Sequence, residues 1–257
     1  MNIDSKIILE LSKKAGKAIL EIYNNPSQSD VVDYKADDSP LTLADKASHN
    51  VIVDGLMKHF PNIPIISEEG QVPEYDVRRD YDQYWLIDPL DGTKEFVNKN
   101  GQFTVNIALI SKNKPVFGVV YKPVTDELYI GDSEQGAYKY EGLNKRKIEV
   151  NNSISNRIAV RSKSHASPEE DDVLKQFDVT DSISVGSSLK FCMVAEGKAD
   201  VYYRHGPTME WDTAAGHAVV EAAGGNVYIG TGAKPFVYNK ENLLNGSFLC
   251  LGFSRDN

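Results

Sequence analysis

The segment Trp85-Leu86-Ile87-Asp88-Pro89-Leu90-Asp91-Gly92-Thr93 constrains this chain more than any other part of its sequence. It sends a run of apolar strand residues into a Pro-containing turn that carries two carboxylates, a glycine and a hydroxyl. Asp88 and Asp91 stand three positions apart and can converge on one point beyond the strand end. Magnesium prefers oxygen ligands in octahedral array. The turn therefore predicts a magnesium site made from both carboxylates and the Leu90 carbonyl, with an ordinary surface Asp-Pro turn as the alternative.

The pattern of apolar residues changes near residue 150, although no linker separates the two parts. Before it, helical spacing predicts helices over 5–24 and 42–60, followed by an antiparallel meander. After it, strands and helices alternate, and Gly224-Gly225 ends the last helix. We therefore expect two tightly packed halves, 1–150 and 151–257. The meander strands are expected over 103–110, 116–121, 127–130 and 137–140, and the later helices over 168–177, 188–196 and 211–223.

Charge and composition narrow the function classes. The 257 residues carry a net charge of -9, which argues against a nucleic-acid groove but not against a phosphorylated small molecule, because bound cations invert the local charge. No apolar run reaches membrane-spanning length and no leader is visible, so we expect a cytoplasmic protein, with peripheral attachment at the inner membrane surface left open. Cys192 and Cys250 are predicted to be buried small hydrophobes.

Four acidic elements stand where a predicted helix or strand begins or ends: Asp45, Glu68-Glu69, the Asp88/Asp91 pair and Asp212. Each has an ordinary explanation, since carboxylates suit the first turn of a helix or a solvated loop. Together, however, carboxylates clustered in one site would repel each other unless divalent ions were bound. Two such ions about 3.5–4 Å apart can clamp the attacking and leaving oxygens of a phosphoryl displacement.

Three of these motifs resemble a known family. Glu68-Glu69, the turn from Asp88 to Thr93, and Trp211-Asp212-Thr213-Ala214-Ala215-Gly216 are similar to the signatures of the inositol monophosphatase superfamily, which are lithium-sensitive, magnesium-dependent phosphatases. The resemblance implies a layered αβαβα sugar-phosphatase fold with its site between the two halves. The first half would carry most of the metal ligands, and the second would complete the metal and nucleotide site.

The resemblance implies a site for two or three magnesium ions. Glu68, Asp88 and the Leu90 carbonyl would hold one ion, and Asp88, Asp91 and Asp212 a second. A metal-bound water loses its proton more easily than free water does.

The resemblance also implies how the attacking water is handled. Asp45 would pair with the Thr93 hydroxyl to orient and deprotonate it, near a third, loosely held ion, and Glu69 would stand beyond the direct ligands. Gly92 has no side chain to block the phosphate, and its N–H with that of Thr93 would bind phosphate oxygens.

The second half is expected to choose the substrate. Gly186-Ser187-Ser188 stands where a strand gives way to a helix, which predicts free N–H groups and two hydroxyls, and Lys190 can reach a second phosphate. An N-cap serine beside a solvated lysine is the alternative. This segment and Lys94-Glu95-Phe96 resemble the bacterial 3'(2'),5'-bisphosphate nucleotidases of sulfate assimilation, where an arginine commonly stands at the position of Lys163. The implied substrate contacts are Glu68, Gly92, Thr93, Ser162, His165, Gly186, Ser187, Ser188, Lys190 and Asp212.

Three functions follow from these patterns. The first is hydrolysis of adenosine 3',5'-bisphosphate to AMP and phosphate, with the 5'-phosphosulfate relative equally open. The second is the same chemistry on an inositol or sugar phosphate, which has less need of Lys190. The third is a nucleotide-binding sensor without turnover, against which the intact set of acidic residues and Thr93 argues. The oligomeric state is open, and a monomer is favoured by analogy.

Overall fold

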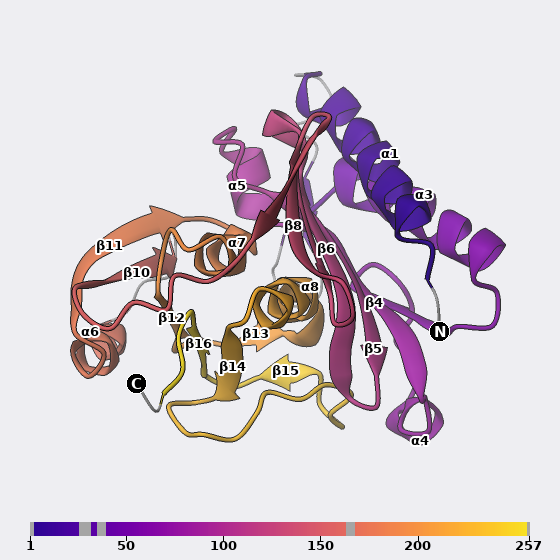
Figure 1. Ribbon diagram of the computed structural model, residues 1–257. Helices are drawn as coiled ribbons and strands as arrows, with labels where there is room; N and C mark the ends of the chain where they lie inside the picture. The colour runs from indigo at the N-terminus through magenta and orange to yellow at the C-terminus, as the bar shows by residue number, and fades with distance from the viewer. Residues whose placement is uncertain (1–2, 26–31, 35–39, 163–167, 256–257) are drawn as a thin grey trace.

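The computed structural model describes residues 3–25, 32–34, 40–162 and 168–255, and its elements stack in five layers (Figure 1). Helices α1 (Ser5–Tyr23) and α3 (Leu43–His59) cover one face of a seven-stranded sheet. Helices α7 (Leu189–Ala195) and α8 (Glu210–Ala222) lie between that sheet and a five-stranded sheet. Helix α6 (Pro168–Lys175) covers the outer face of the second sheet. The predicted layered α/β architecture is confirmed.

The first sheet is a meander with one parallel edge. Strand β3 runs parallel to β4, and every later neighbour is antiparallel, in the order β3-β4-β5-β6-β7-β8-β9. The strands are β3 (Ile65–Ser67), β4 (Gln83–Asp91), β5 (Thr104–Ser111), β6 (Lys114–Lys122), β7 (Glu127–Asp132), β8 (Gly136–Glu141) and β9 (Asn144–Ile148). The antiparallel meander predicted from the sequence is therefore correct, and β9 extends it.

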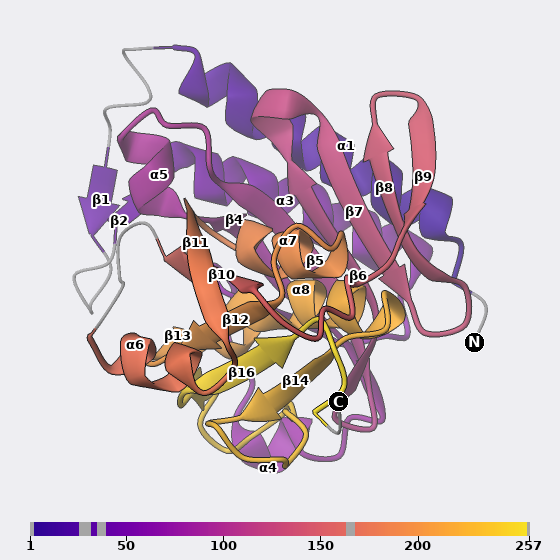
Figure 2. The same ribbon diagram turned by 60° about the vertical axis from the view of Figure 1, so that its left-hand side comes forward.

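The second sheet mixes both directions, in the order β11-β10-β12-β16-β14. Strand β10 is parallel to β11 and β12, whereas β16 is antiparallel to β12 and β14 (Figure 2). Its strands are β10 (Arg157–Ser162), β11 (Val179–Val185), β12 (Val201–Arg204), β14 (Asn226–Ile229) and β16 (Phe248–Leu251). The remaining elements are β1 (Val32–Tyr34), β2 (Pro40–Thr42), α4 (Tyr75–Arg78), α5 (Thr93–Val97), η1 (Pro123–Thr125), β13 (Thr208–Met209) and β15 (Leu244–Asn245).

Helix α8 lies unusually close to the first sheet because two strand positions are glycine. A Cβ at Gly118 of β6 would stand 2.6 Å from the Ala215 carbonyl oxygen, and one at Gly131 of β7 would stand 2.4 Å from that of Ala218. Both distances are too short for a side chain, so any larger residue would push the helix away. Since Asp212 lies in the first turn of α8, these glycines also fix the distance between Asp212 and the sheet.

One local prediction is wrong in an informative way. The turn after Ile87 does not end the strand, because β4 continues to Asp91, which pairs with Thr104 of β5. The pairing register shifts between Asp88 and Asp91, so the Pro-containing segment is an irregularity inside the strand. The Ser48 hydroxyl on α3 donates to the Pro89 carbonyl at 2.7 Å and holds this irregularity against the helix layer.

Two further expectations concern the cysteines and membrane-spanning helices. Cys192 and Cys250 are buried and unpaired, as predicted. Among the described residues, none of the helices combines the length and the apolar character that a membrane span requires.

Candidate active site

Three carboxylates from distant parts of the chain meet at one point. Glu68, Asp88 and Asp212 each offer an oxygen, and these oxygens lie within 4.8 Å of one another. Glu68 follows β3, where its N–H donates to the Ile87 carbonyl at 3.1 Å, so the parallel β3-β4 pairing brings it beside Asp88. Asp212 is contributed by the first turn of α8.

The electrostatics of this cluster disfavour three negative charges. Asp88 is 1% exposed, and its pKa is raised by burial first and then by the charges of Glu68, Asp91 and Asp212. The pKa of Asp212 is raised by burial and by Asp91 and Glu68, which outweigh the hydrogen bond from the Met209 N–H. Buried like charges need protons or a cation. An all-carboxylate donor set suits a hard divalent ion such as magnesium, so these residues fit the metal that the sequence predicts.

Asp91 lies next to the cluster and is heavily hydrogen-bonded. Its Oδ2 accepts from the Ser187 hydroxyl at 2.7 Å and from the Ser188 N–H at 2.6 Å. The Ser188 hydroxyl lies 2.7 Å from the same oxygen and 2.7 Å from the Asp212 carbonyl oxygen. These bonds join β4 to α7 and α8, and so bring carboxylates from distant parts of the chain together.

The same contacts correct the prediction of free N–H groups at the start of α7. The Gly186 N–H donates to Gln102 Oε1 at 2.9 Å, and the Ser188 N–H donates to Asp91. The segment folds this way because Gly186 leaves room for its neighbours: a Cβ there would stand 2.9 Å from Glu95 Cγ. The Ser187 hydroxyl also has protein partners, so its contact with a substrate remains a proposal.

Asp45 stands where the sequence places it, in the first turn of α3, and is 2% exposed. Its Oδ2 accepts from the N–H of Thr42 at 2.8 Å and from the hydroxyl of Thr42 at 2.6 Å, which forms a capping box. Burial raises its pKa to about 6, with smaller contributions from Glu69 and Glu68. Asp45 is thus electrostatically linked to the cluster, whereas its pairing with Thr93 remains a proposal.

Gly92 connects the cluster to a cavity of about 310 Å³. Its φ of +91° is in the left-handed region, and a Cβ would stand 3.3 Å from Ser187 Cβ and from Glu95 Oε2. Helix α5 begins at the next residue, Thr93. Of the predicted site residues, the cavity is lined by Glu68, Asp91, Gly92, Thr93, Ser162, Gly186, Ser187, Ser188, Lys190 and Asp212. His165 and Lys163 fall outside the described residues.

Three basic residues line this cavity, Lys94, Lys190 and Arg204, and the sequence pattern singled out only Lys190 as a phosphate contact. Lys190 is 6% exposed, and its ammonium donates to the Ser187 carbonyl at 2.6 Å. Burial, with a smaller contribution from Arg204, lowers its pKa to about 8 against the opposing charge of Asp91. Arg204, at the end of β12, donates to the Gly206 carbonyl at 3.2 Å. No local motif marks Arg204, because only the crossing of β12 beneath α7 brings it to the cavity.

Comparison with known proteins agrees with this architecture. The model of the inositol monophosphatase family matches residues 4–251. The chain therefore belongs to the inositol monophosphatase family, a class of phosphatases.

Particular relatives are bacterial nucleotidases. The chain is 48% identical to the 3'(2'),5'-bisphosphate nucleotidase CysQ of Escherichia coli K12 over 242 residues, which cover 94% of this chain and 96% of that protein. It is 33% identical to CysQ of Haemophilus influenzae, covering 95% and 91%. The crystal structure of CysQ from Bacteroides thetaiotaomicron matches with a TM-score of 0.85 and 44% identity, over 97% of both chains. An inositol monophosphatase from Anabaena matches with a TM-score of 0.73 and 26% identity, covering 96% of this chain and 89% of that one.

Proposed function

We propose that this protein is a magnesium-dependent 3'(2'),5'-bisphosphate nucleotidase that hydrolyses adenosine 3',5'-bisphosphate to AMP and phosphate. The observation that carries the proposal is the carboxylate cluster of Glu68, Asp88 and Asp212 beside a cavity that is lined by Lys190 and Arg204. The similarity to CysQ proteins at 45–48% identity supports the same activity. A cytoplasmic location, a monomeric state and the number of ions stay predictions.

The chain's own residues divide the work between two ends of the site. Glu68, Asp88, Asp91, Asp212 and the Leu90 carbonyl are proposed to hold two magnesium ions, with a third ion more loosely held. Magnesium supplies charge neutralisation of the phosphate and lowers the pKa of a coordinated water. Phosphate ester hydrolysis depends mostly on such positioning and charge stabilisation, so the carboxylates would act by fixing where the cations stand.

The water and the scissile phosphate would be held by the α5 end of the cavity. We propose that Asp45 accepts a hydrogen bond from Thr93, whose hydroxyl orients the attacking water, while Glu69 stands beyond the direct ligands. A buried Asp45 with a pKa of about 6 can hold a proton for part of the reaction near neutral pH. The N–H groups of Gly92 and Thr93 are proposed to bind phosphate oxygens.

We assign the second phosphate of the substrate to Lys190 and Arg204, which we call the cationic wall of the cavity. Lys190 and Arg204 line the cavity on the side of the second sheet, with Ser162 at the end of β10. Two cations on this side of the cavity suit a dianion at some distance from the scissile group. We include His165 and the Gly186-Ser187-Ser188 segment as proposed nucleoside contacts. An inositol monophosphate has one phosphate and would leave these cations unpaired.

The test measures phosphate release from adenosine 3',5'-bisphosphate and from inositol 1-phosphate, with magnesium and then with added lithium. We expect lithium-suppressed turnover of the nucleotide. Preference for inositol 1-phosphate would favour the alternative of an inositol or sugar phosphatase. Release from neither substrate would favour a nucleotide-binding sensor.

A second experiment isolates the cationic wall. We expect Lys190→Ala to lower kcat/KM for adenosine 3',5'-bisphosphate by about 10-fold or more, a loss typical of a charge-assisted contact. The loss on adenosine 3'-monophosphate, which has no second phosphate, should be much smaller. Equal losses on both substrates would remove Lys190 from substrate choice.

A further inference from the structure

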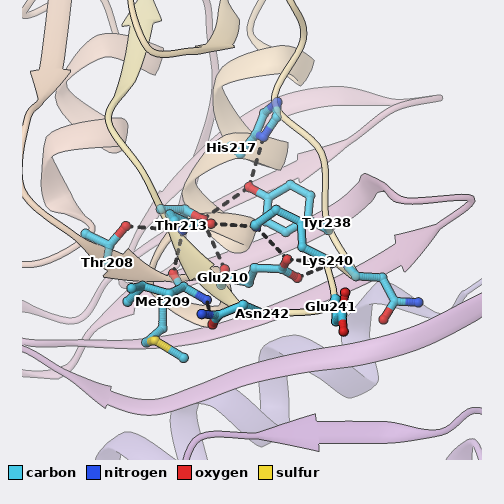
Figure 3. A network of polar contacts seen from close by, with 12 residues as sticks. Thr208, Met209, Glu210, Thr213, His217, Tyr238, Lys240, Glu241 and Asn242 are labelled. Atoms are coloured by element: carbon cyan, nitrogen blue, oxygen red, sulfur yellow. Dashed lines mark hydrogen bonds and ion pairs between the residues drawn. The ribbon is translucent and has the colours of Figure 1, made fainter. Parts of the chain in front are cut away.

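The first turn of α8, which carries Asp212, is held by a network of buried polar groups (Figure 3). Glu210 is fully buried and stands two residues before Asp212. Its Oε2 accepts from the Asn239 N–H at 2.7 Å. Its Oε1 accepts from the Lys240 N–H at 3.0 Å and from the Lys240 ammonium at 2.6 Å. The segment that follows Tyr238 is therefore tied to the start of α8 by three hydrogen bonds to one carboxylate.

The network continues from Lys240 to the residue that caps the helix. The Lys240 ammonium also donates to Asn245 Oδ1 at 2.8 Å. The amide of Asn245 donates in turn to the Met209 carbonyl at 2.8 Å and lies 3.1 Å from the Thr208 hydroxyl. The Met209 N–H donates to Asp212 Oδ2 at 2.8 Å. A continuous path thus leads from Glu210 and Lys240 to the carboxylate of Asp212.

Arg78 also holds the segment that contains Asn239 and Lys240. Arg78, which is 3% exposed, donates to Asn239 Oδ1 at 2.8 Å and to the Lys240 carbonyl at 2.7 Å. Asn239 has a φ of +64°, a left-handed conformation that asparagine tolerates better than most residues. The segment is therefore held in one conformation from both sides, and it presents two backbone donors to Glu210.

The placement of these groups calls for an explanation. In the Glu210–Lys240 pair the carboxylate is fully buried and the lysine side chain is 32% exposed. Exposed ion pairs add little stability and buried ones seldom more than apolar packing of the same volume, so stability alone does not account for this pair. Neither residue lines the cavity, whereas Thr208, Asp212 and Thr213, which they help to hold, do. The first N–H groups of a helix lack intrahelical partners, so a first turn is prone to fray unless it is held from outside.

We propose that Glu210 and Lys240 are positioning residues that fix Asp212 in the geometry required for divalent metal binding. This inference rests on the proposed function, because it takes Asp212 to be a metal ligand. With the network intact, the Asp212 carboxylate is fixed at the point where Glu68 and Asp88 converge. Without it, the first turn of α8 gains freedom, and the third carboxylate is displaced from the other two for part of the time.

The test measures binding of Mn²⁺ to the metal-free protein by electron paramagnetic resonance, which counts free Mn²⁺ and needs no turnover. Lys240→Met removes the ammonium at nearly constant volume, and Asn245→Ala removes the amide that holds Met209. We expect each change to raise the Kd for Mn²⁺ by about 10-fold, the lower end of the effect seen when partners of metal ligands are lost. Lys240→Arg keeps a cationic donor and should recover most of the affinity.

The matched control is Glu196→Gln. Glu196 is also a fully buried carboxylate with cationic partners, Arg146 at 2.6 Å and Lys198 at 3.0 Å, but it lies at the C-terminal end of α7. A purely structural role for the Glu210–Lys240 pair predicts that Lys240→Met and Glu196→Gln both lower Tm and both leave the Kd unchanged. Our proposal predicts a raised Kd for the first variant alone.

Asp212→Asn distinguishes metal binding by Asp212 from the positioning of Asp212 by Glu210 and Lys240. If Asp212→Asn raises the Kd while Lys240→Met and Asn245→Ala do not, the positioning role is wrong and the metal site stands. If Asp212→Asn leaves the Kd unchanged, the metal assignment itself is wrong. Asn245→Ala changes no charge, so it carries the test if Lys240→Met fails to fold.

Discussion

Two charge clusters, each built around one buried charged side chain, Lys139 or Asp88, differ in whether they contain a cation. Around Lys139, which is 2% exposed, Glu127 lies 2.6 Å and Glu141 2.7 Å from the ammonium. Burial alone would raise the pKa of Glu127, but hydrogen bonds from Lys139 and Thr125 lower it to about 2. The other cluster brings together only carboxylates, and there burial and mutual repulsion raise pKa values.

This difference supports a structural role for the first cluster and the proposed metal-binding role for the second. In the Lys139 cluster the protein supplies its own counter-charges, so the carboxylates are satisfied in the folded chain. In the cluster of Glu68, Asp88 and Asp212, like charges gather where burial disfavours them. Bound protons or a cation must offset this repulsion, and a donor set made only of carboxylates is the physical basis for proposing a divalent metal.

The largest expected effect is on turnover. Asp88→Asn removes the carboxylate shared by both proposed ions, so kcat/KM for adenosine 3',5'-bisphosphate should fall more than about 100-fold, beyond the loss seen when only partners of metal ligands are removed. Phosphate release at saturating magnesium measures it. Near-normal activity would show that Asp88 is not a shared ligand.

The next effect is on the stability of the Lys139 cluster. Lys139→Met leaves Glu127 without its closest cation. Because the Glu127 side chain is 23% exposed and Lys122 remains 3.6 Å away, the free energy of unfolding should fall by about 1 kcal/mol. Urea denaturation measures the change, and the folded variant should keep its kcat/KM. A loss of turnover in the folded variant would mean that the two clusters are not independent.

The two clusters should also respond to pH in opposite directions. In EDTA, a raised folded-state pKa means that protonation favours the folded state, so the stability linked to Asp45, Asp88 and Asp212 is lost as pH rises. For Asp45 the loss spans the interval from the unfolded value of about 4 to its folded value of about 6. Glu127 has a lowered pKa, so its contribution is present above the unfolded value and is lost as pH falls toward about 2.

Thermal unfolding in EDTA between about pH 5 and pH 8 tests this difference, because Glu127, with its lowered pKa, does not titrate there. We expect Tm to fall as pH rises, and saturating magnesium to reduce the slope. A Tm that rises with pH in EDTA would contradict the assignment of raised pKa values to the site.

The smallest expected effect is on the pH profile. Lys190 has a pKa of about 8, so its ammonium is lost as pH rises through that value, and kcat/KM for the bisphosphate should decline there. In Lys190→Arg the guanidinium stays charged, and the decline should move to higher pH. If Lys190→Arg has the same pH profile of kcat/KM as the wild type, the decline does not come from deprotonation of Lys190.

The sequence predicted local structure well where the signal was local. Helical spacing marked α1, α3 and α8, and alternation marked the meander. Strands β14 and β16 were missed because each has four residues and gains its stability from partners distant in the chain. The free N–H groups predicted at Gly186 and Ser188 were wrong for a related reason, since their acceptors, Gln102 and Asp91, lie far away in the sequence.

The site shows the same limit. Carboxylates in recognisable motifs, such as Glu68, Asp88 and Asp212, were predicted together and lie together. Arg204 and Glu210 belong to no motif that could be read as a site, and their importance depends on tertiary neighbours alone. Chemistry concentrated in short segments can be read from a sequence, whereas the groups that hold those segments in place require the fold.

We expect the buried carboxylate of Asp88 to lower the free energy of unfolding until a metal binds. Thermal unfolding of the wild-type protein and of Asp88→Asn, first in EDTA and then in saturating magnesium, tests it directly. We predict that Asp88→Asn has the higher Tm in EDTA, because a buried charge is removed, and that magnesium raises the Tm of the wild type above that of the variant. A variant that is less stable than the wild type in EDTA, or equal magnesium shifts in both proteins, would contradict the account.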